Sequence, residues 1–211
     1  MTQRTRVKIC GCTSRGDVEL ALAWGADYVG FIFAPSPRRI ALEEAARITA
    51  DLPPSLTPVG VFVNPSRDEL ARALASVPRM VVQLSGDETP DLVTSVEAPI
   101  FKAVHVRTGD DAQTLRSRSE PYPGATILFD AYDERARGGT GRTVSWEMIA
   151  PIARERPVIV AGGLHPGNVA ACIRTVRPFA VDVRSGVERD GRKDPVLVRA
   201  FMEAVRDADA A

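Results

Sequence analysis

The chain has 211 residues, 45% of them hydrophobic and 26% charged, so it is long enough for one sizeable core and has an ordinary globular composition. Basic and acidic residues are equal in number, 27 each, which gives no sign of a nucleic-acid-binding surface, and no apolar run has the length of a membrane span. The N-terminus lacks the apolar core of a signal peptide and the three cysteines form no disulfide framework, so we expect a cytoplasmic protein that binds neither nucleic acid nor membrane.

The first half of the chain repeats a short β-branched run, a turn and an amphipathic helix. The predicted strands are Val7–Cys10, Tyr28–Phe33, Val59–Val63 and Met80–Leu84. The helices predicted to follow them are Ser14–Ala23, one with its apolar face over Leu42–Leu52, one beginning at Ser66, and a short stretch around Asp91–Val96. Gly25 is suited to close the first helix because glycine tolerates the left-handed conformation at a helix end.

The second half continues the same alternation. The predicted strands are Ile100–Val106, Thr126–Asp130, Val158–Ala161 and Ala180–Val183. The predicted helices are Asp110–Ser117, Trp146–Ile152, one with Val169, Cys172, Ile173 and Val176 on one stripe, and a last helix that begins near Asp194-Pro195. A glycine-rich loop at 138–141 separates the sixth strand from its helix, and Asp207–Ala211 is expected to be a frayed tail.

Eight strand–helix units at about 25-residue spacing, with no break in composition, predict an α/β fold made of a single (β/α)8 barrel domain over residues 1–211. An open doubly wound sheet is the alternative, but it would normally have fewer strands. In a barrel the active site lies at the C-terminal ends of the strands, where the loops that follow them form one mouth.

Four polar residues lie at or next to the C-terminal ends of predicted strands, namely Cys10, Gln83, Asp130 and Asp182, and Arg38 lies in the loop after the second strand. A cysteine at a strand end can serve as a base once its thiolate is favoured, although a free cysteine is more often a small buried hydrophobe. A carboxylate inside an apolar run is costly unless it is paired or neutralised, so each aspartate is either functional or bonded to a neighbouring loop.

The loops after the last two strands are rich in small residues. Gly162-Gly163 follows the seventh strand, and Arg184-Ser185-Gly186 follows the eighth. Barrels often bind a phosphate at these two loops through backbone N–H groups, and glycine lets the backbone approach the phosphate oxygens. The pattern therefore predicts a phosphate site made by Gly162, Gly163, Arg184, Ser185 and Gly186.

Eight short motifs follow one another along nearly the whole chain. They are Lys8–Gly11, Gly30–Phe33, Ser36–Arg38, Val82–Gly86, Phe129–Ala131, Gly138–Gly141, Gly162–Leu164 and Val181–Glu188. Each is weak alone, but in this order they resemble the motif series of the phosphoribosylanthranilate isomerase family, barrel enzymes of tryptophan biosynthesis.

The resemblance implies an Amadori rearrangement of N-(5-phosphoribosyl)anthranilate to 1-(2-carboxyphenylamino)-1-deoxyribulose 5-phosphate, without a metal or organic cofactor. It also implies that Cys10 is the general base and Asp130 the general acid, and that Gly141 joins the phosphate-binding residues. Arg38, Gln83 and Asp182 are then expected to bind the substrate, with Arg38 on the anthranilate carboxylate. The only expected partner is this phosphosugar–anthranilate molecule, bound by a monomer or a homodimer.

The chemistry gives independent support to the acid–base pair. Ring opening needs a proton on the ribose ring oxygen, and a carboxyl group beside Phe129 can stay protonated because apolar surroundings disfavour its charged form. The resulting Schiff base has an acidic C2′ proton, which a thiolate across the barrel mouth could remove. Lys8 alternates in phase with Cys10 and could supply the cation that the thiolate needs.

Three residues depart from the family pattern. Arg184 replaces a small hydroxyl residue, Ser85 replaces a frequent histidine, and Cys12 stands where an apolar residue is common.

Three other functions are alternatives to the isomerase. A non-catalytic phosphosugar-binding barrel would lack the acid or the base. A metal or redox site at Cys10 and Cys12 would need further ligands, which only His105, His165 and Cys172 could supply. A sister isomerase that acts on a histidine-pathway intermediate would have an aspartate in place of Cys10.

Overall fold

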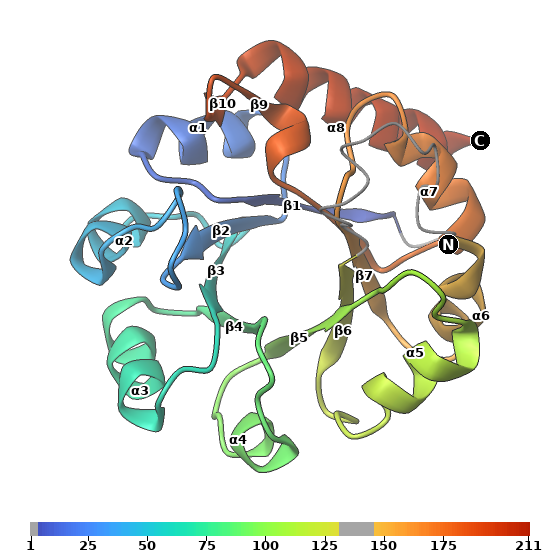
Figure 1. Ribbon diagram of the computed structural model, residues 1–211. Coiled ribbons are helices and arrows are strands. Elements are labelled where there is room, and N and C mark those ends of the chain that lie inside the picture. Colours follow the sequence, from blue (N-terminus) through green and yellow to red (C-terminus); the bar gives the residue numbers. More distant parts are fainter. Residues whose placement is uncertain (1–3, 131–145) are drawn as a thin grey trace.

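The computed structural model describes residues 4–130 and 146–211, and its eight parallel strands close into one barrel in sequence order. The strands are β1 (Arg6–Cys10), β2 (Tyr28–Ile32), β3 (Thr57–Phe62), β4 (Val81–Leu84), β5 (Ile100–His105), β6 (Thr126–Asp130), β7 (Val158–Ala161) and β8 (Ala180–Val183). Figure 1 looks along the barrel and shows the helices arranged around its outside. The predicted (β/α)8 barrel is thus confirmed.

Helices alternate with the strands, as the sequence pattern predicted. They are α1 (Arg15–Ala23), α2 (Leu42–Thr49), α3 (Arg67–Ser76), α4 (Pro90–Thr94), α5 (Ala112–Ser119), α6 (Ala150–Ala153), α7 (Val169–Val176) and α8 (Pro195–Ala210), with short 3₁₀ turns η2 (Trp146–Met148) and η3 (Ser185–Val187). Local capping begins several of them: Ser14 and Ser66 each form a capping box with the acidic residue three positions later.

Alternation along the strands decides what points into the barrel. Many inward positions are apolar, and their side chains form one buried cluster of Tyr28, Val59, Val81, Phe101, Ala103, Leu128, Ile159, Ala161 and Ala180. Further along, the inward positions become polar. Lys8 of β1 lies directly opposite Asp182 of β8 in the strand register, and His105 of β5 lies opposite Asp130 of β6. The polar inward side chains therefore gather at the C-terminal ends.

Two short strands after β8 form a hairpin that the sequence analysis did not predict. Strands β9 (Glu188–Arg189) and β10 (Arg192–Lys193) pair in antiparallel fashion, and the turn residues Asp190 and Gly191 have φ of 49° and 76°. Two successive left-handed residues make the turn typical of an Asp-Gly hairpin. The Asp-Gly dipeptide was the sequence signal that could have identified it. The hairpin lies beside α1 (Figure 1).

The C-terminal tail is not frayed, so that expectation was wrong. Helix α8 continues to Ala210, and the Asp209 carboxylate accepts hydrogen bonds from the Thr5 amide at 2.8 Å and the Thr5 hydroxyl at 2.7 Å. These contacts tie the last helical turn to the residue just before β1, and a sequence window at the C-terminus does not contain that residue.

Among the described residues the longest helix, α8, has 16 residues, and no helix there combines the length and the apolar character that crossing a membrane requires.

The contact between the two ends of the chain can be tested by substitution. Asp209→Ala is expected to lower the free energy of unfolding by about 1–3 kcal/mol, because the buried Thr5 amide and hydroxyl lose their acceptor. Urea denaturation followed by circular dichroism measures the change. Asp207→Ala is the matched control, since this exposed aspartate lies on the same part of the helix. An equal loss of stability in both variants would contradict the prediction.

Candidate active site

A cavity of about 380 Å³ opens at the C-terminal ends of the barrel strands. All eight strands or the loops after them contribute to its lining, which includes Cys10, Gln83, Ser85, His105, Asp130, Gly162, Gly163, Asp182, Arg184 and Ser185. The structure therefore brings together both predicted acid–base residues and most of the predicted substrate-binding and phosphate-binding residues.

A buried ion pair adjoins the cavity through Asp182, one of the lining residues. Lys8 Nζ lies 2.8 Å from Asp182 Oδ2, and the side chains are 0% and 7% exposed. A Cβ placed on Gly30 would lie 3.0 Å from Cys10 Sγ and 3.2 Å from Lys8 Nζ. The missing side chain at Gly30 thus leaves the space into which the thiol and the ammonium group both project.

This arrangement acts on the pKa of both groups. Burial alone would lower the pKa of Lys8, but its charge interactions and hydrogen bonds with Asp182 and Cys10 together raise that pKa, so Lys8 stays charged. Burial raises the pKa of the Cys10 thiol; the charge of Lys8 opposes this rise and that of Asp182 adds to it. Lys8 is therefore the cation that favours a Cys10 thiolate, as its phase along the strand suggested.

Two buried oxygen atoms in the lining lack a hydrogen-bond partner among the described residues, Gln83 Oε1 and Asp182 Oδ1. Gln83 donates from Nε2 to Ser85 Oγ at 3.1 Å, while Asp182 uses its other oxygen for Lys8. A buried acceptor without a donor is unfavourable, and both atoms belong to side chains that line the cavity. They are suited to accept from hydroxyl groups of a bound molecule.

His105 also lines the cavity, although the sequence analysis gave it no role. Its Nε2 lies 3.1 Å from the Ser85 carbonyl oxygen. Because a carbonyl only accepts, Nε2 carries a proton, and in the neutral ring Nδ1 is an acceptor. The imidazole comes from β5, next to the strand that carries Asp130. It lies close to the position of Ser85, where the family frequently has a histidine.

The two predicted phosphate loops behave differently. Gly162 and Gly163 have φ of 85° and 66°, which favours glycine, and both line the cavity with Arg184 and Ser185. Gly186 is not among the lining residues. A Cβ there would lie 1.9 Å from the Leu164 carbonyl oxygen, so Gly186 is needed for the loop after β8 to pack on the loop after β7. Gly141 lies outside the described residues.

Arg38 is not among the residues that line the cavity, although its neighbours Ser36 and Pro37 are. Its Nη2 lies 2.9 Å from Glu188 Oε2 in the β9–β10 hairpin, and Lys193 Nζ lies 2.9 Å from Glu188 Oε1. The sequence analysis singled out neither Lys193 nor the carboxylate of Glu188, because the hairpin that carries them was not predicted.

A second buried ion pair supports the loop after β4. Lys102 Nζ lies 2.9 Å from Glu88 Oε2, and Glu88 also accepts from the Asn64 and Gly86 amides. Lys102 donates to the Gly86 carbonyl at 2.8 Å. These bonds fix the loop that follows Gln83, and no sequence pattern indicated them.

Cys12 does not line the cavity, and its Sγ lies 3.5 Å from the Ile9 carbonyl oxygen. Burial raises its pKa to about 12. Within residues 4–130 and 146–211 no cluster of three or more His, Cys, Asp or Glu side chains could hold a metal ion.

Comparisons with known proteins point to one family. The model of the N-(5′-phosphoribosyl)anthranilate (PRA) isomerase family matches residues 7–204. A protein of Leptothrix cholodnii named N-(5′-phosphoribosyl)anthranilate isomerase is 46% identical over 98% of this chain and 93% of its own length. A relative of the same name from Pseudomonas fluorescens is 46% identical over 98% of both chains.

Solved structures agree with this relationship. The phosphoribosylanthranilate isomerase of Thermotoga maritima superposes with a TM-score of 0.87 at 38% identity, over 96% of this chain and 99% of its own. A second isomerase structure, with a TM-score of 0.84 at 36% identity and the same coverage, is a complex with reduced 1-(o-carboxyphenylamino)-1-deoxyribulose 5-phosphate.

The raised pKa of Cys10 predicts how this thiol reacts. Only the thiolate is alkylated, so labelling by iodoacetamide should accelerate with pH through a midpoint above the ordinary thiol value of about 8.5. Lys8→Met removes the cation that lowers this pKa, so labelling at a fixed pH should become slower. Site-resolved mass spectrometry measures the rate, with Cys172, whose pKa burial raises to about 12, as the internal comparison. A midpoint below the ordinary value would contradict the prediction.

Proposed function

This chain belongs to the N-(5′-phosphoribosyl)anthranilate isomerase family, and we propose that it converts PRA to 1-(2-carboxyphenylamino)-1-deoxyribulose 5-phosphate in tryptophan biosynthesis. The observation that carries this proposal is that Cys10 and Asp130, from β1 and β6, line one cavity together with Gln83 and Asp182. One buried oxygen of each of these two side chains has no hydrogen-bond partner among the described residues, and Asp182 pairs through its other oxygen with the buried Lys8. The reaction needs one general acid and one general base, which Asp130 and Cys10 can supply. The substrate also carries hydroxyl groups, to which the two buried acceptor oxygens can bind.

In the proposed mechanism Asp130 donates a proton to the ribose ring oxygen while the C1′–O bond breaks. The anthranilate nitrogen forms a double bond to C1′ with its lone pair, which gives a Schiff base and makes the C2′ proton acidic. The Cys10 thiolate removes that proton and the electrons of the C–H bond form an enolamine, which tautomerises to the ketone. Every bond change in this scheme is assisted only by a general acid or a general base, so we propose that no metal or organic cofactor takes part.

Lys8, Gln83 and Asp182 would support these steps. The Lys8 charge favours the thiolate form of Cys10, and Asp182 holds the ammonium group in place at 2.8 Å. Gln83 Oε1 and Asp182 Oδ1 would accept from ribose hydroxyl groups, which are donors of the type that these atoms lack.

The two ends of the substrate differ in charge and shape. We assign the phosphate to the backbone of Gly162, Gly163 and Ser185, which line the cavity, with the Arg184 charge beside it. Gly186, which follows Ser185 but does not line the cavity, and Gly141, which lies outside the described residues, are further predicted contacts. The aromatic ring would lie against the apolar part of the lining, made by Ile32, Ala34, Pro37, Val61 and Val63. Arg38 would pair with the ring carboxylate in two-point fashion.

We also propose that the protein acts in the cytoplasm as a monomer or a homodimer, without a nucleic-acid or membrane partner. One solved relative, from Thermotoga maritima, is described as dimeric.

A direct test follows the fluorescence change as enzymatically generated PRA is consumed. Cys10→Ser keeps the shape but supplies a far weaker base, and Asp130→Asn keeps the shape but cannot deliver the proton. Each substitution should lower kcat by roughly 10²–10⁴-fold, the usual contribution of one positioned proton transfer, while binding is largely retained.

The alternatives predict other results. A wild-type chain that binds PRA without turnover would be a non-catalytic phosphosugar-binding barrel. Near-normal kcat in either variant would remove that residue from the mechanism, and loss of binding with kcat retained would make it a substrate holder instead.

The role of Arg184 is tested by Arg184→Ser, which restores the small hydroxyl residue usual in the family. If the guanidinium binds the phosphate, KM should rise roughly tenfold, equivalent to about 1.4 kcal/mol, and KM should depend less on salt concentration. Arg174→Ser removes the same charge from an exposed position on α7 and serves as control. If KM and its salt dependence are both unchanged in Arg184→Ser, the guanidinium does not bind the phosphate, and residue 184 can contribute only through its backbone N–H group.

A further inference from the structure

The β9–β10 hairpin holds the guanidinium of Arg38 from one side. Glu188 accepts from Arg38 Nη2 at 2.9 Å and from Nε at 3.4 Å, so it occupies the Nε–Nη2 edge of the fork. Among the described residues the Nη1 donors and the second proton of Nη2 have no acceptor, which leaves this edge for another carboxylate. The separation of the two residues along the chain is 150 positions, and only the closed barrel brings them together.

The charge of this cluster stays positive. Lys193 Nζ lies 2.9 Å from Glu188 Oε1 and donates to the Arg184 carbonyl at 3.2 Å, with its side chain only 2% exposed. Burial alone would raise the pKa of Glu188, but hydrogen bonds from Arg38 and Lys193 hold that pKa below its ordinary value. Two cations and one carboxylate leave one net positive charge. Lys193 therefore neutralises the Glu188 carboxylate, so that the positive charge of Arg38 remains for a ligand.

The turn of the hairpin supports the flat face of the same group. A Cβ on Gly191 would lie 2.8 Å from Arg38 Nη2 and 3.3 Å from its Cζ. The guanidinium thus lies so close to Gly191 that a side chain at this position would force it to shift. The left-handed φ of 76° independently favours glycine at this position.

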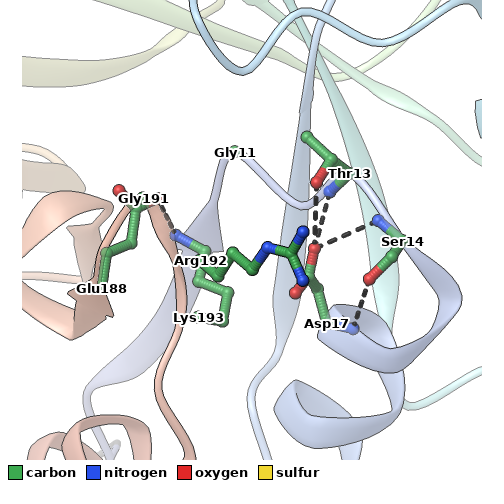
Figure 2. Close-up of a pocket in the computed structure, with 8 residues that line it drawn as sticks. All are labelled: Gly11, Thr13, Ser14, Asp17, Glu188, Gly191, Arg192 and Lys193. Carbon is green, nitrogen blue, oxygen red and sulfur yellow. Dashed lines mark hydrogen bonds and ion pairs between the residues drawn. The ribbon is translucent and has the colours of Figure 1, made fainter.

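The hairpin and the start of α1 line a second cavity from opposite sides. Figure 2 shows a second cavity whose lining comes from both parts, with Gly11, Thr13, Ser14 and Asp17 facing Glu188, Gly191, Arg192 and Lys193. The Arg192 guanidinium extends toward Asp17 (Figure 2), whose carboxylate already accepts from the Thr13 amide at 2.8 Å and the Ser14 amide at 3.1 Å. The hairpin that carries the partners of Arg38 therefore lies next to the segment that leaves β1.

We infer that Glu188 is a positioning residue for substrate specificity: with Lys193 and Gly191 it fixes Arg38 so that the free edge of the guanidinium selects ligands with an aromatic carboxylate. This inference rests on the proposed function, in which Arg38 meets that carboxylate. Without Glu188 the long arginine side chain would sample several rotamers, and a bound carboxylate would have to order it.

The test compares two ligands that differ in one group. They are the reduced product, 1-(2-carboxyphenylamino)-1-deoxyribulose 5-phosphate with its carbonyl reduced, and its phenylamino counterpart without the carboxylate. The ratio of their Kd values, measured by isothermal titration calorimetry, reports carboxylate recognition alone. Glu188→Gln should lower this preference by about tenfold and leave the Kd of the carboxylate-free ligand within about twofold of wild type.

Three further variants separate positioning from general damage. Arg38→Ala should abolish the preference, and adding Glu188→Gln to it should cause no further change, because the second residue acts through the first. Glu155→Gln removes a carboxylate from the exposed Arg116–Glu155 pair and should leave the preference intact. If Glu188→Gln does not fold, Gly191→Ala, which displaces the guanidinium by a methyl group, should lower the preference instead.

Retention of the carboxylate preference in folded Glu188→Gln would overturn the inference, as would equal weakening of both ligands, which marks a merely structural role. In both cases the proposed function would still be supported if the wild-type chain turns over PRA. Failure of the wild-type chain to turn over PRA would instead reject the proposed function.

Discussion

The ion pair between Lys8 and Asp182 is the constraint on which the site depends. A lysine with no exposed surface inside a barrel is costly unless a carboxylate neutralises it, and the strand register places Asp182 directly opposite. Asp182 lines the cavity, while Lys8 lies buried behind it. The pair therefore adds a charged contact to the β1–β8 ladder and connects the buried lysine to the mouth of the barrel.

The same contact governs the chemistry proposed for Cys10. Burial raises the pKa of the thiol and the Lys8 charge opposes that rise. The balance of these two effects sets the fraction of Cys10 that is present as the thiolate. Asp182 orients the lysine with one oxygen and keeps the other available to a ligand. A single buried pair therefore joins the stability of the barrel, the ionisation of the base and the binding of the substrate.

Membership in the PRA isomerase family and the geometry contribute different things. The family relationship names the reaction, while the cavity indicates which atoms of this chain can take part in it. The departures at Ser85 and Arg184 are informative in this respect. Ser85 orients Gln83 and its carbonyl meets His105, and Arg184 lines the cavity from the loop after β8. Neither departure removes a group on which the proposed mechanism relies.

The sequence by itself determined what depends on neighbours along the chain: strand and helix periodicity, the capping of α1 and α3, the order of the units, and the strand-end positions of Cys10 and Asp130. Only the tertiary structure decided the contacts that join distant segments. Arg38 pairs with Glu188, Gly186 packs on Leu164, and Asp209 binds Thr5. The reason is physical: local patterns fix dihedral angles and the buried face of each element, whereas side-chain partners follow from barrel closure, which brings together residues that no sequence window contains.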